Sequence, residues 1–263
     1  MVEGISSFRG PVTSNDWCEK NYVYSSYVAE FFNTMSNITS ILLAFVDLIN
    51  ALRQRFEKRF SILHISNIIL AVGSLLYHAT LQHMQQLGDE TPMVWEMLFA
   101  FLHPVLLALL KYNADLFSGP CTPVADLLVS IWSCICSYHA LVRFGIGFKV
   151  HYLILCLLCI PRIYKYYIHT KDRRAKLLAR LYLVSVFIAS LCWLYDRICC
   201  DTIPRWRFNP QGHALWYFFM GFSSYLANTF LMFCRAKQLG WNPKAINFMG
   251  VFPYVKVQKP KTQ

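Results

Sequence analysis

Charged side chains are scarce in this sequence: 15% of its 263 residues are charged, whereas 56% are hydrophobic. A soluble domain carries about a quarter charged residues, so the composition excludes an ordinary water-soluble fold. The sequence also lacks internal repeats, low-complexity linkers and, before Asp16, the basic, apolar and small-residue pattern of a cleaved signal peptide. The apolar excess requires a non-aqueous environment, which indicates a membrane protein whose first apolar segment also acts as the insertion signal.

Long apolar windows account for this excess. A helix needs roughly 20 residues to cross about 30 Å of hydrocarbon. Seven windows qualify, near 29–51, 61–82, 92–110, 123–142, 150–168, 177–196 and 213–234. We therefore predict an all-α integral membrane protein, a bundle of seven transmembrane helices that forms a single domain over 1–263. Residues 1–28 precede the bundle, 29–234 make it, and 235–263 form a basic tail.

The distribution of lysine and arginine predicts the orientation, because short cytoplasmic loops retain these residues. Most of the 25 fall in the connections after the first, third and fifth windows and in the C-terminal tail. We therefore predict a lumenal N terminus and a cytosolic C terminus. The net charge of +11 then needs no nucleic-acid partner, and its cytosolic share favours an anionic leaflet.

The C-terminal residues bear on localisation. Lys259 and Lys261 lie near the end of the chain, like the dilysine tags that return membrane proteins to the endoplasmic reticulum. We therefore predict the endoplasmic reticulum membrane, while a solvated basic tail is the alternative.

Ten cysteines are present, and nine of them fall into two groups. Those inside apolar windows are expected to be packing residues: Cys134, Cys136, Cys156, Cys159, Cys192 and Cys234. Cys18, Cys199 and Cys200 are predicted on the lumenal side, which is oxidising. A disulfide between Cys18 and Cys200 is plausible there, with Cys199 as the competing partner.

Ionisable residues inside a membrane are costly, so they indicate function unless they form interhelical hydrogen bonds. The candidates are Glu30, His78, Glu96, His103, Asp126, His139, Asp196 and His213. The predicted topology places four residues near the lumenal ends of their helices: His78, Asp89, Asp196 and His213. This convergence favours a site over isolated hydrogen-bonded pairs.

Spacing indicates the chemistry of that site. Residues four apart share a helix face, so Ser74 lies with His78, and Tyr217 lies with His213. Two histidines on different helices, with the Asp89 carboxylate and the Ser74 hydroxyl, contain the components of a catalytic zinc site. By spacing alone, structural hydrogen bonding remains the alternative.

A second cluster precedes the first window. Asp16, Glu19 and Glu30 supply carboxylates, and Asn21 supplies an amide, within a short stretch. Such oxygen ligands suit calcium. An acidic cap at the start of the first helix is the alternative.

Several separated motifs run in order along nearly the whole chain: the Gly-Pro-Val-Thr opening at Gly10, Asp16-Trp17-Cys18-Glu19 with Asn21, Ala29-Glu30-Phe31 with Asn33-Thr34, Gly73-Ser74 with Tyr77-His78, Asp89-Glu90 with Pro92-Met93, Asp196, and His213-Ala214 with Trp216. Together these motifs resemble the alkaline ceramidase family, most closely its fungal and plant-type phytoceramidases and dihydroceramidases.

The resemblance implies a seven-helix amidase of the endoplasmic reticulum or Golgi that hydrolyses ceramide to a sphingoid base and a fatty acid. It implies zinc held by His78 and by two histidines of the last helix, with Ser74 and Asp89 as catalytic residues. It also implies calcium held by Asp16, Glu19, Asn21, Glu30 and the carbonyl of Trp17, which reverses the preference for a helix cap.

One position departs from the family pattern, because Tyr217 stands where the second histidine of the last helix is expected. Tyr217 could bind zinc as a phenolate, or the chain could be an impaired or inactive lipid-binding relative. A substitution at an otherwise active site is the third possibility, and Glu96 is a candidate compensating ligand. The progestin and adiponectin receptor group shares a seven-helix zinc plan, but the cluster from Asp16 to Glu30 argues against it.

Overall fold

The structure is a computed structural model that describes residues 17–97, 130, 131, 134, 138, 154, 163–200, 209–248 and 252–260. The chain divides into two compact units, one made of Met1–Asp89 with Thr170–Gln263 and the other of Glu90–His169. The architecture below is that of the first unit. Its helices are α1 (Phe31–Arg53), α2 (Lys58–Thr80), α7 (Arg173–Cys199) and α8 (Gly212–Gln238). The helix α3 (His83–Met97) begins in this unit.

Three described helices are long and apolar enough to cross a membrane, namely α1, α2 and α7. Large apolar side chains point outward along them, among them Leu42 on α1, Ile62 on α2 and Phe187 on α7. In water these exposed side chains would be unfavourable, whereas against lipid they are expected. The helical membrane class predicted from the sequence is therefore supported. The number of spans and the side on which each terminus lies remain predictions, as does the single-domain organisation.

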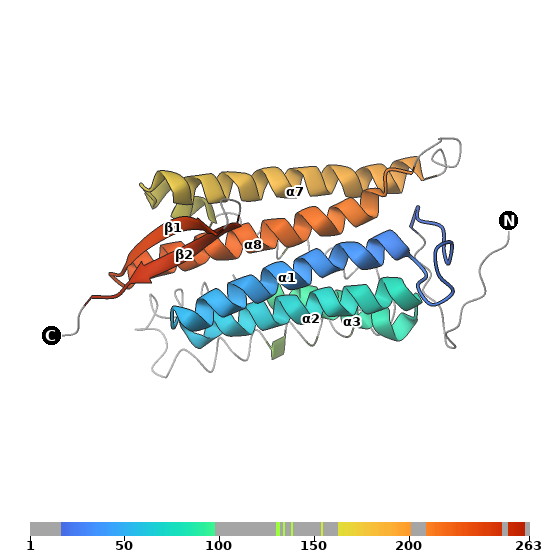
Figure 1. Ribbon diagram of the computed structural model, residues 1–263, viewed down its shortest axis with the longest axis horizontal. Coiled ribbons are helices and arrows are strands. Elements are labelled where there is room, and N and C mark those ends of the chain that lie inside the picture. The colour runs from blue at the N-terminus through green and yellow to red at the C-terminus, as the bar shows by residue number, and fades with distance from the viewer. Residues whose placement is uncertain are drawn as a thin grey trace. The chain divides into compact units, whose positions relative to one another are not determined.

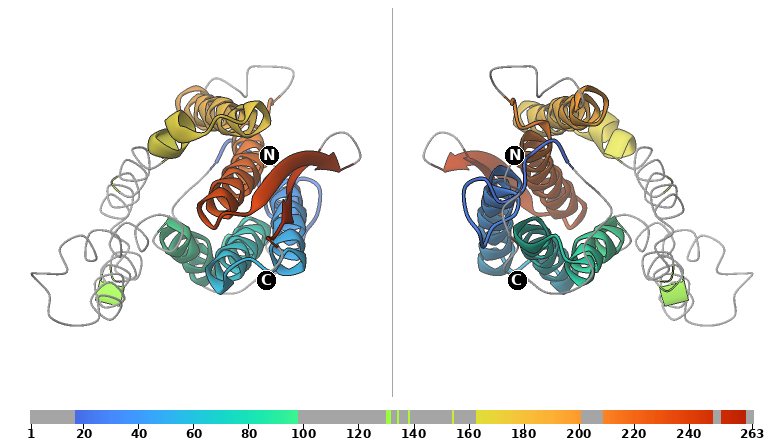
Figure 2. Two further views of the ribbon diagram at one scale, coloured as in Figure 1. Left: turned by 90° about the vertical axis from the view of Figure 1, so that its left-hand side faces the viewer. Right: turned by 90° about the vertical axis from the view of Figure 1, so that its right-hand side faces the viewer.

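Helix α8 lies between α7 and α1, and α2 packs on the other side of α1 (Figures 1 and 2). The second half of α8 is almost entirely buried, including Phe230 and Phe233. Its close approach to α1 depends on Gly221, because a Cβ at that position would overlap the side chain of Ser40. Helix α8 is thus the central element of the unit, packed against both α7 and α1.

Helices α7 and α8 extend beyond their predicted windows at both ends, whereas α1 and α2 are shifted along the chain by two or three residues from theirs. Helix α3 differs most, because it starts at His83, whereas its apolar window starts at 92. Its first turns are polar, with Gln85, Gln86 and Asp89. Hydropathy therefore could not detect them.

The tail contains an antiparallel hairpin of β1 (Asn242–Phe248) and β2 (Phe252–Gln258), which the sequence analysis did not predict. One face of it packs on α8, with Ala245 and Val255 buried. A two-stranded hairpin is marginally stable in water. It is ordered here because α8 covers its apolar face.

Candidate functional site

The predicted site residues meet at one end of the first unit. The start of α8, the end of α2, the end of α7 and the segment leading into α1 lie at this end (Figure 1). The ring centroids of His78 and His213 are 5.1 Å apart, and both side chains are buried. Asp89 and Asp196 are buried as well. Residues from three separate stretches of the chain therefore form one cluster.

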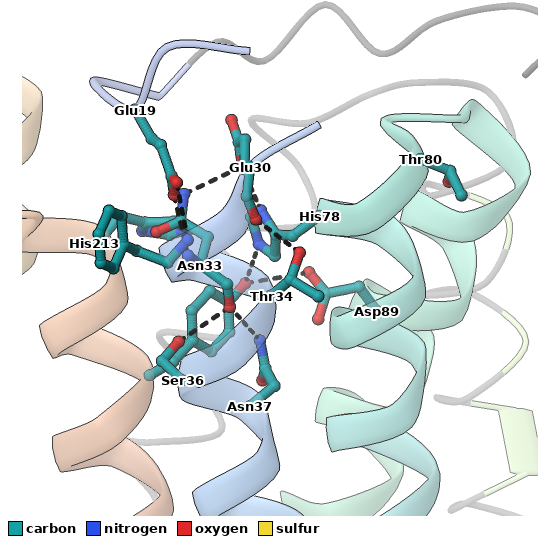
Figure 3. Close-up of polar contacts among 12 residues, drawn as sticks. Glu19, Glu30, Asn33, Thr34, Ser36, Asn37, His78, Thr80, Asp89 and His213 are labelled. Atoms are coloured by element: carbon teal, nitrogen blue, oxygen red, sulfur yellow. Dashed lines mark hydrogen bonds and ion pairs between the residues drawn. The ribbon is translucent and has the colours of Figure 1, made fainter. Parts of the chain in front are cut away.

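His78 is held through both ring nitrogens. Its Nδ1 lies 2.5 Å from Oε2 of Glu30, and its Nε2 lies 2.8 Å from the hydroxyl of Tyr217. The donor in each contact depends on the imidazole tautomer; in the tautomer that donates from Nδ1 to Glu30, Nε2 is the nitrogen left for a metal. Asn33 donates a second hydrogen bond to the same Glu30 oxygen, at 2.9 Å. Figure 3 shows Glu30 between Asn33 and His78.

Tyr217 is placed between the histidines and the carboxylate. Its hydroxyl lies 3.4 Å from Oδ2 of Asp89, and its ring centroid is 4.8 Å from that of His213. Ser74 interacts with both Asp89 and Tyr217, although its hydroxyl makes no hydrogen bond of standard geometry. The residue that departs from the family pattern therefore lies within the cluster and contacts its members directly.

His213 is held by packing and by its backbone. The Trp17 ring stacks on the His213 ring with centroids 3.3 Å apart, and the Arg197 guanidinium lies 3.8 Å from the opposite side of the pair, over the Trp17 ring. The His213 amide donates to Oδ1 of Asp196 at 3.2 Å. Gly212 is required beside it, because a Cβ there would lie 2.7 Å from the Cys192 carbonyl oxygen.

The segment that carries Trp17 is tied to α7. Cys18 is joined to Cys200 by a disulfide with a Cα–Cα distance of 5.2 Å, while Cys199 forms no disulfide among the described residues. The Cys18 amide donates to Oδ2 of Asp196 at 3.4 Å, and Asn209 donates to the Cys18 carbonyl at 2.9 Å. Asp196 thus fastens both Cys18 and the first turn of α8.

Several buried polar atoms of the cluster have no hydrogen-bond partner within the part of the chain that the structure describes. They are both ring nitrogens of His213 and Oδ1 of Asp89. Buried polar atoms are normally paired, so such a group favours a ligand at this position. Two imidazoles and nearby oxygen donors are a set that zinc accepts. His78 and His213 therefore fit zinc, and Glu30 orients His78 as carboxylates commonly orient zinc-bound histidines.

The position of a third zinc ligand fits zinc less well. Among the described residues, no group of three or more His, Cys, Asp or Glu side chains is spaced to hold a metal. The hydroxyl of Tyr217 lies 2.8 Å from Nε2 of His78, the nitrogen on the side away from Glu30. A metal at this place would need the Tyr217 oxygen as a ligand or would need that side chain to move.

The acidic cluster of the N-terminal segment includes a helix cap, which is formed by Glu19. Glu19 is buried and accepts hydrogen bonds from the amides of Phe32 at 2.7 Å and Asn33 at 2.9 Å, at the start of α1. Burial raises the pKa of Glu19, these two amides lower it, and nearby Glu30 raises it further. A cation would relieve the repulsion between the two carboxylates.

The remaining oxygens also bear on calcium. Oε1 of Glu30 and Oδ1 of Asn33 are buried and lack partners among the described residues. Calcium binds such oxygen donors. Asn21 is exposed, and Asp16 lies outside the described residues. The cap and the cation are compatible, because each carboxylate oxygen has more than one lone pair.

Some predicted residues cannot be placed, and others were missed. His103, Asp126 and His139 lie outside the described residues, as does the side chain of Glu96. The sequence analysis used only the carbonyl of Trp17 and gave no role to Arg197. Their stacking on His213 joins segments far apart in the chain, and no local pattern signals such a contact.

Comparisons with known proteins agree in pointing to one family. The ceramidase family model matches residues 10–256. An alkaline ceramidase of Arabidopsis thaliana is 61% identical, with all of both chains covered. Alkaline ceramidase 3 of Mus musculus is 28% identical over 94% of this chain and 93% of its own. Alkaline ceramidase 1 of Homo sapiens is 25% identical over 77% of this chain and 75% of its own.

Proposed function

Because the chain belongs to the ceramidase family, we propose that it is a membrane amidohydrolase that cleaves the amide bond of ceramide to release a sphingoid base and a fatty acid. The observation that carries this proposal is the buried cluster of His78, His213, Asp89 and Ser74. It combines nitrogen ligands, a carboxylate and a hydroxyl without hydrogen-bond partners for several of their atoms. Phytoceramide and dihydroceramide are the proposed variants of the substrate.

His78 and His213 are the proposed zinc ligands, with Tyr217 as the third candidate. Zinc held there would supply Lewis acidity toward the amide carbonyl and a lowered pKa for water. A hydrogen bond donated by Nδ1 to Glu30 would leave the Nε2 lone pair of His78 directed into the cluster. Trp17 and Asp196 hold the plane and position of His213.

Proton transfer and stabilisation of the developing oxyanion are assigned to oxygen-bearing side chains of the chain itself. Asp89 is the proposed catalytic base, which takes a proton from the attacking water and passes it to the leaving amine. Ser74 is the proposed donor to the oxygen that becomes negative as the amide carbon turns tetrahedral. Both residues are buried, so the charge develops away from bulk water, where such hydrogen bonds are stronger.

The N-terminal segment is proposed to bind calcium. Glu19 and Glu30 supply buried carboxylates, and Asn21, Asp16 and the Trp17 carbonyl complete the proposed ligand set. The cation would stabilise the segment that places Trp17 over His213.

The proposal also includes the number of membrane spans and the side of the membrane on which each terminus lies. Seven transmembrane helices, a lumenal N terminus and a cytosolic C terminus would place the cluster on the lumenal side of the endoplasmic reticulum or Golgi membrane. The disulfide between Cys18 and Cys200 supports that side, because disulfides persist in the lumen.

The direct test is hydrolysis by the purified, zinc-loaded chain. We expect release of a sphingoid base from ceramide and its loss in His78→Ala. A His169→Ala variant is a matched control, since it removes an exposed histidine whose Nδ1 lies 2.8 Å from the Lys165 carbonyl of its own helix. No release by the zinc-loaded wild type would contradict the proposed activity.

Tyr217 supports a second candidate, a catalytically impaired or inactive lipid-binding relative. Its hydroxyl already pairs with His78, which competes with zinc for the same nitrogen. Metal analysis separates the two. Zinc at one per chain, lost in His78→Ala, supports the enzyme. No bound zinc in the wild type, with zinc and hydrolysis both gained in Tyr217→His, supports the impaired relative.

A further inference from the structure

The hairpin of β1 and β2 has one exposed face, and the residue types on this face change regularly along the strands. Residues directly opposite in an antiparallel pair lie on the same face. The residues of the exposed face, from the base to the turn, are Asn242 opposite Gln258, Lys244 opposite Lys256, Ile246 opposite Tyr254, and Phe252 next to the turn. The face therefore changes from polar through basic to apolar and aromatic.

The lysine pair is unfavourable for the hairpin by itself. Lys244 and Lys256 are direct cross-strand partners, both exposed. Like charges in this position destabilise a sheet. Within the described part of the chain, neither lysine has an ion-pair partner. An anion from outside the chain would remove the repulsion.

The hairpin runs back along α8 instead of away from it (Figure 1). Its base follows the end of α8, since Asn242 comes shortly after Gln238. Next to its turn, the Pro253 carbonyl accepts a hydrogen bond of 2.6 Å from Tyr225, which lies near the middle of α8. The sequence of polar, basic and aromatic pairs therefore follows the helix axis from the end of the bundle toward its centre.

Neighbouring helices fix the direction in which this face points. Arg174 of α7 donates to the Ala245 carbonyl at 3.1 Å. The Val257 amide donates to the side chain of Gln54, just after α1, at 3.3 Å. The hairpin is anchored on both strands, so its free face is presented in one orientation (Figure 2).

We propose that this face binds the anionic headgroup of a phospholipid in the protein's own bilayer. Lys244 and Lys256 meet the headgroup phosphate. Tyr254 and Phe252, which is 36% exposed, enter the boundary between headgroups and acyl chains. Aromatic residues favour that level of a membrane, and basic residues favour anionic lipid at its surface. The inference does not depend on the proposed enzymatic activity.

The test uses the full chain in phosphatidylcholine nanodiscs, titrated with dansyl-labelled phosphatidylserine and followed by energy transfer from tryptophan. Each lysine near an anionic surface contributes about fivefold in affinity, so Lys244→Gln with Lys256→Gln should weaken phosphatidylserine binding by about 30-fold. Lys244→Arg with Lys256→Arg should bind like the wild type. Equal binding by the glutamine and wild-type proteins would overturn the proposal.

A control double variant removes two positive charges at the same end of the bundle but outside the hairpin. Lys58 and Lys171 are both exposed, and changing both to Gln should leave binding within about twofold of the wild type. An equal loss in this pair would show that general basic charge, and not the hairpin, attracts the lipid. Competition by inorganic phosphate as strong as by phosphatidylserine vesicles would also overturn the proposal, in favour of a free-anion site.

A single reversal, Lys256→Glu, separates binding from hairpin stability. It replaces the repulsion with a Lys–Glu pair, so the thermal unfolding temperature in phosphatidylcholine should stay the same or rise. Phosphatidylserine binding should nevertheless fall at least as far as in the double glutamine variant. Retained binding in a folded Lys256→Glu protein would contradict the assigned role of the lysine pair.

Discussion

The contact between Gly73 of α2 and Gly88 of α3 supports a sharp prediction, because its two sides are unequal. A Cβ on Gly73 would overlap the carbonyl oxygen of Gly88, and it would lie 2.7 Å from the carbonyl carbon and 3.3 Å from the Asp89 amide. A Cβ on Gly88 would meet only the Cα of Gly73, at 3.9 Å. The next residues along the chain are Ser74 and Asp89, so this contact sets their separation.

The magnitudes follow from the same geometry. Gly73→Ala forces backbone against backbone, which neither helix can avoid by a side-chain rotation, and overpacking of this kind costs about 1–3 kcal/mol. A displacement of catalytic groups by about 1 Å lowers turnover by about 100-fold. Gly88→Ala makes an ordinary contact, and alanine is favoured over glycine in a helix by up to about 1 kcal/mol. It should therefore be neutral or stabilising.

The assay compares the two alanine variants with the wild type in one detergent, by thermal unfolding and by ceramide hydrolysis. We expect Gly73→Ala to unfold at a lower temperature and to lose most activity, and Gly88→Ala to retain both. If the two variants behave alike, the close approach of α2 and α3 does not position Ser74 and Asp89, and the reasoning is refuted.

Three further predictions concern the segment above the cluster. Asp196→Ala should lower the free energy of unfolding by about 1–3 kcal/mol, because the amides of Cys18 and His213 lose their acceptor; thermal unfolding no different from that of Asp196→Asn would contradict this. Calcium chelation should lower the unfolding temperature of the wild type but not of Glu30→Gln, and an unchanged wild type would mean that the acidic cluster acts only as the cap seen for Glu19. Alkylation followed by mass analysis should modify Cys18 and Cys200 only after reduction; their modification without reductant would show that the bond is absent.

Hydropathy predicted α1, α2, α7 and α8 because each of these helices contains a long apolar stretch. The meeting of His78 and His213 was also predictable, since alternating helix directions place both near the same side of the bundle. The beginning of α3 and the C-terminal hairpin were missed. Neither contains a long apolar run, and both are held by contacts with distant helices.

The side chains that hold the site were less accessible to sequence reasoning. Trp17 stacks on His213 from the opposite end of the chain, and Glu19 caps α1 from outside the helix. Such pairs have no fixed spacing and depend on the packed arrangement of helices. By contrast, residues of one helix such as Ser74 and His78 follow from the helical repeat alone.

The central claim is that this chain hydrolyses an amide, and oxygen transfer from water tests it most directly. Hydrolysis adds one water oxygen to the carboxyl group of the fatty acid and none to the sphingoid base. Purified protein turning over ceramide in ¹⁸O-labelled water should therefore give equal amounts of the two products, with one ¹⁸O in each new carboxylate. Absence of products, or unlabelled fatty acid, would contradict the account.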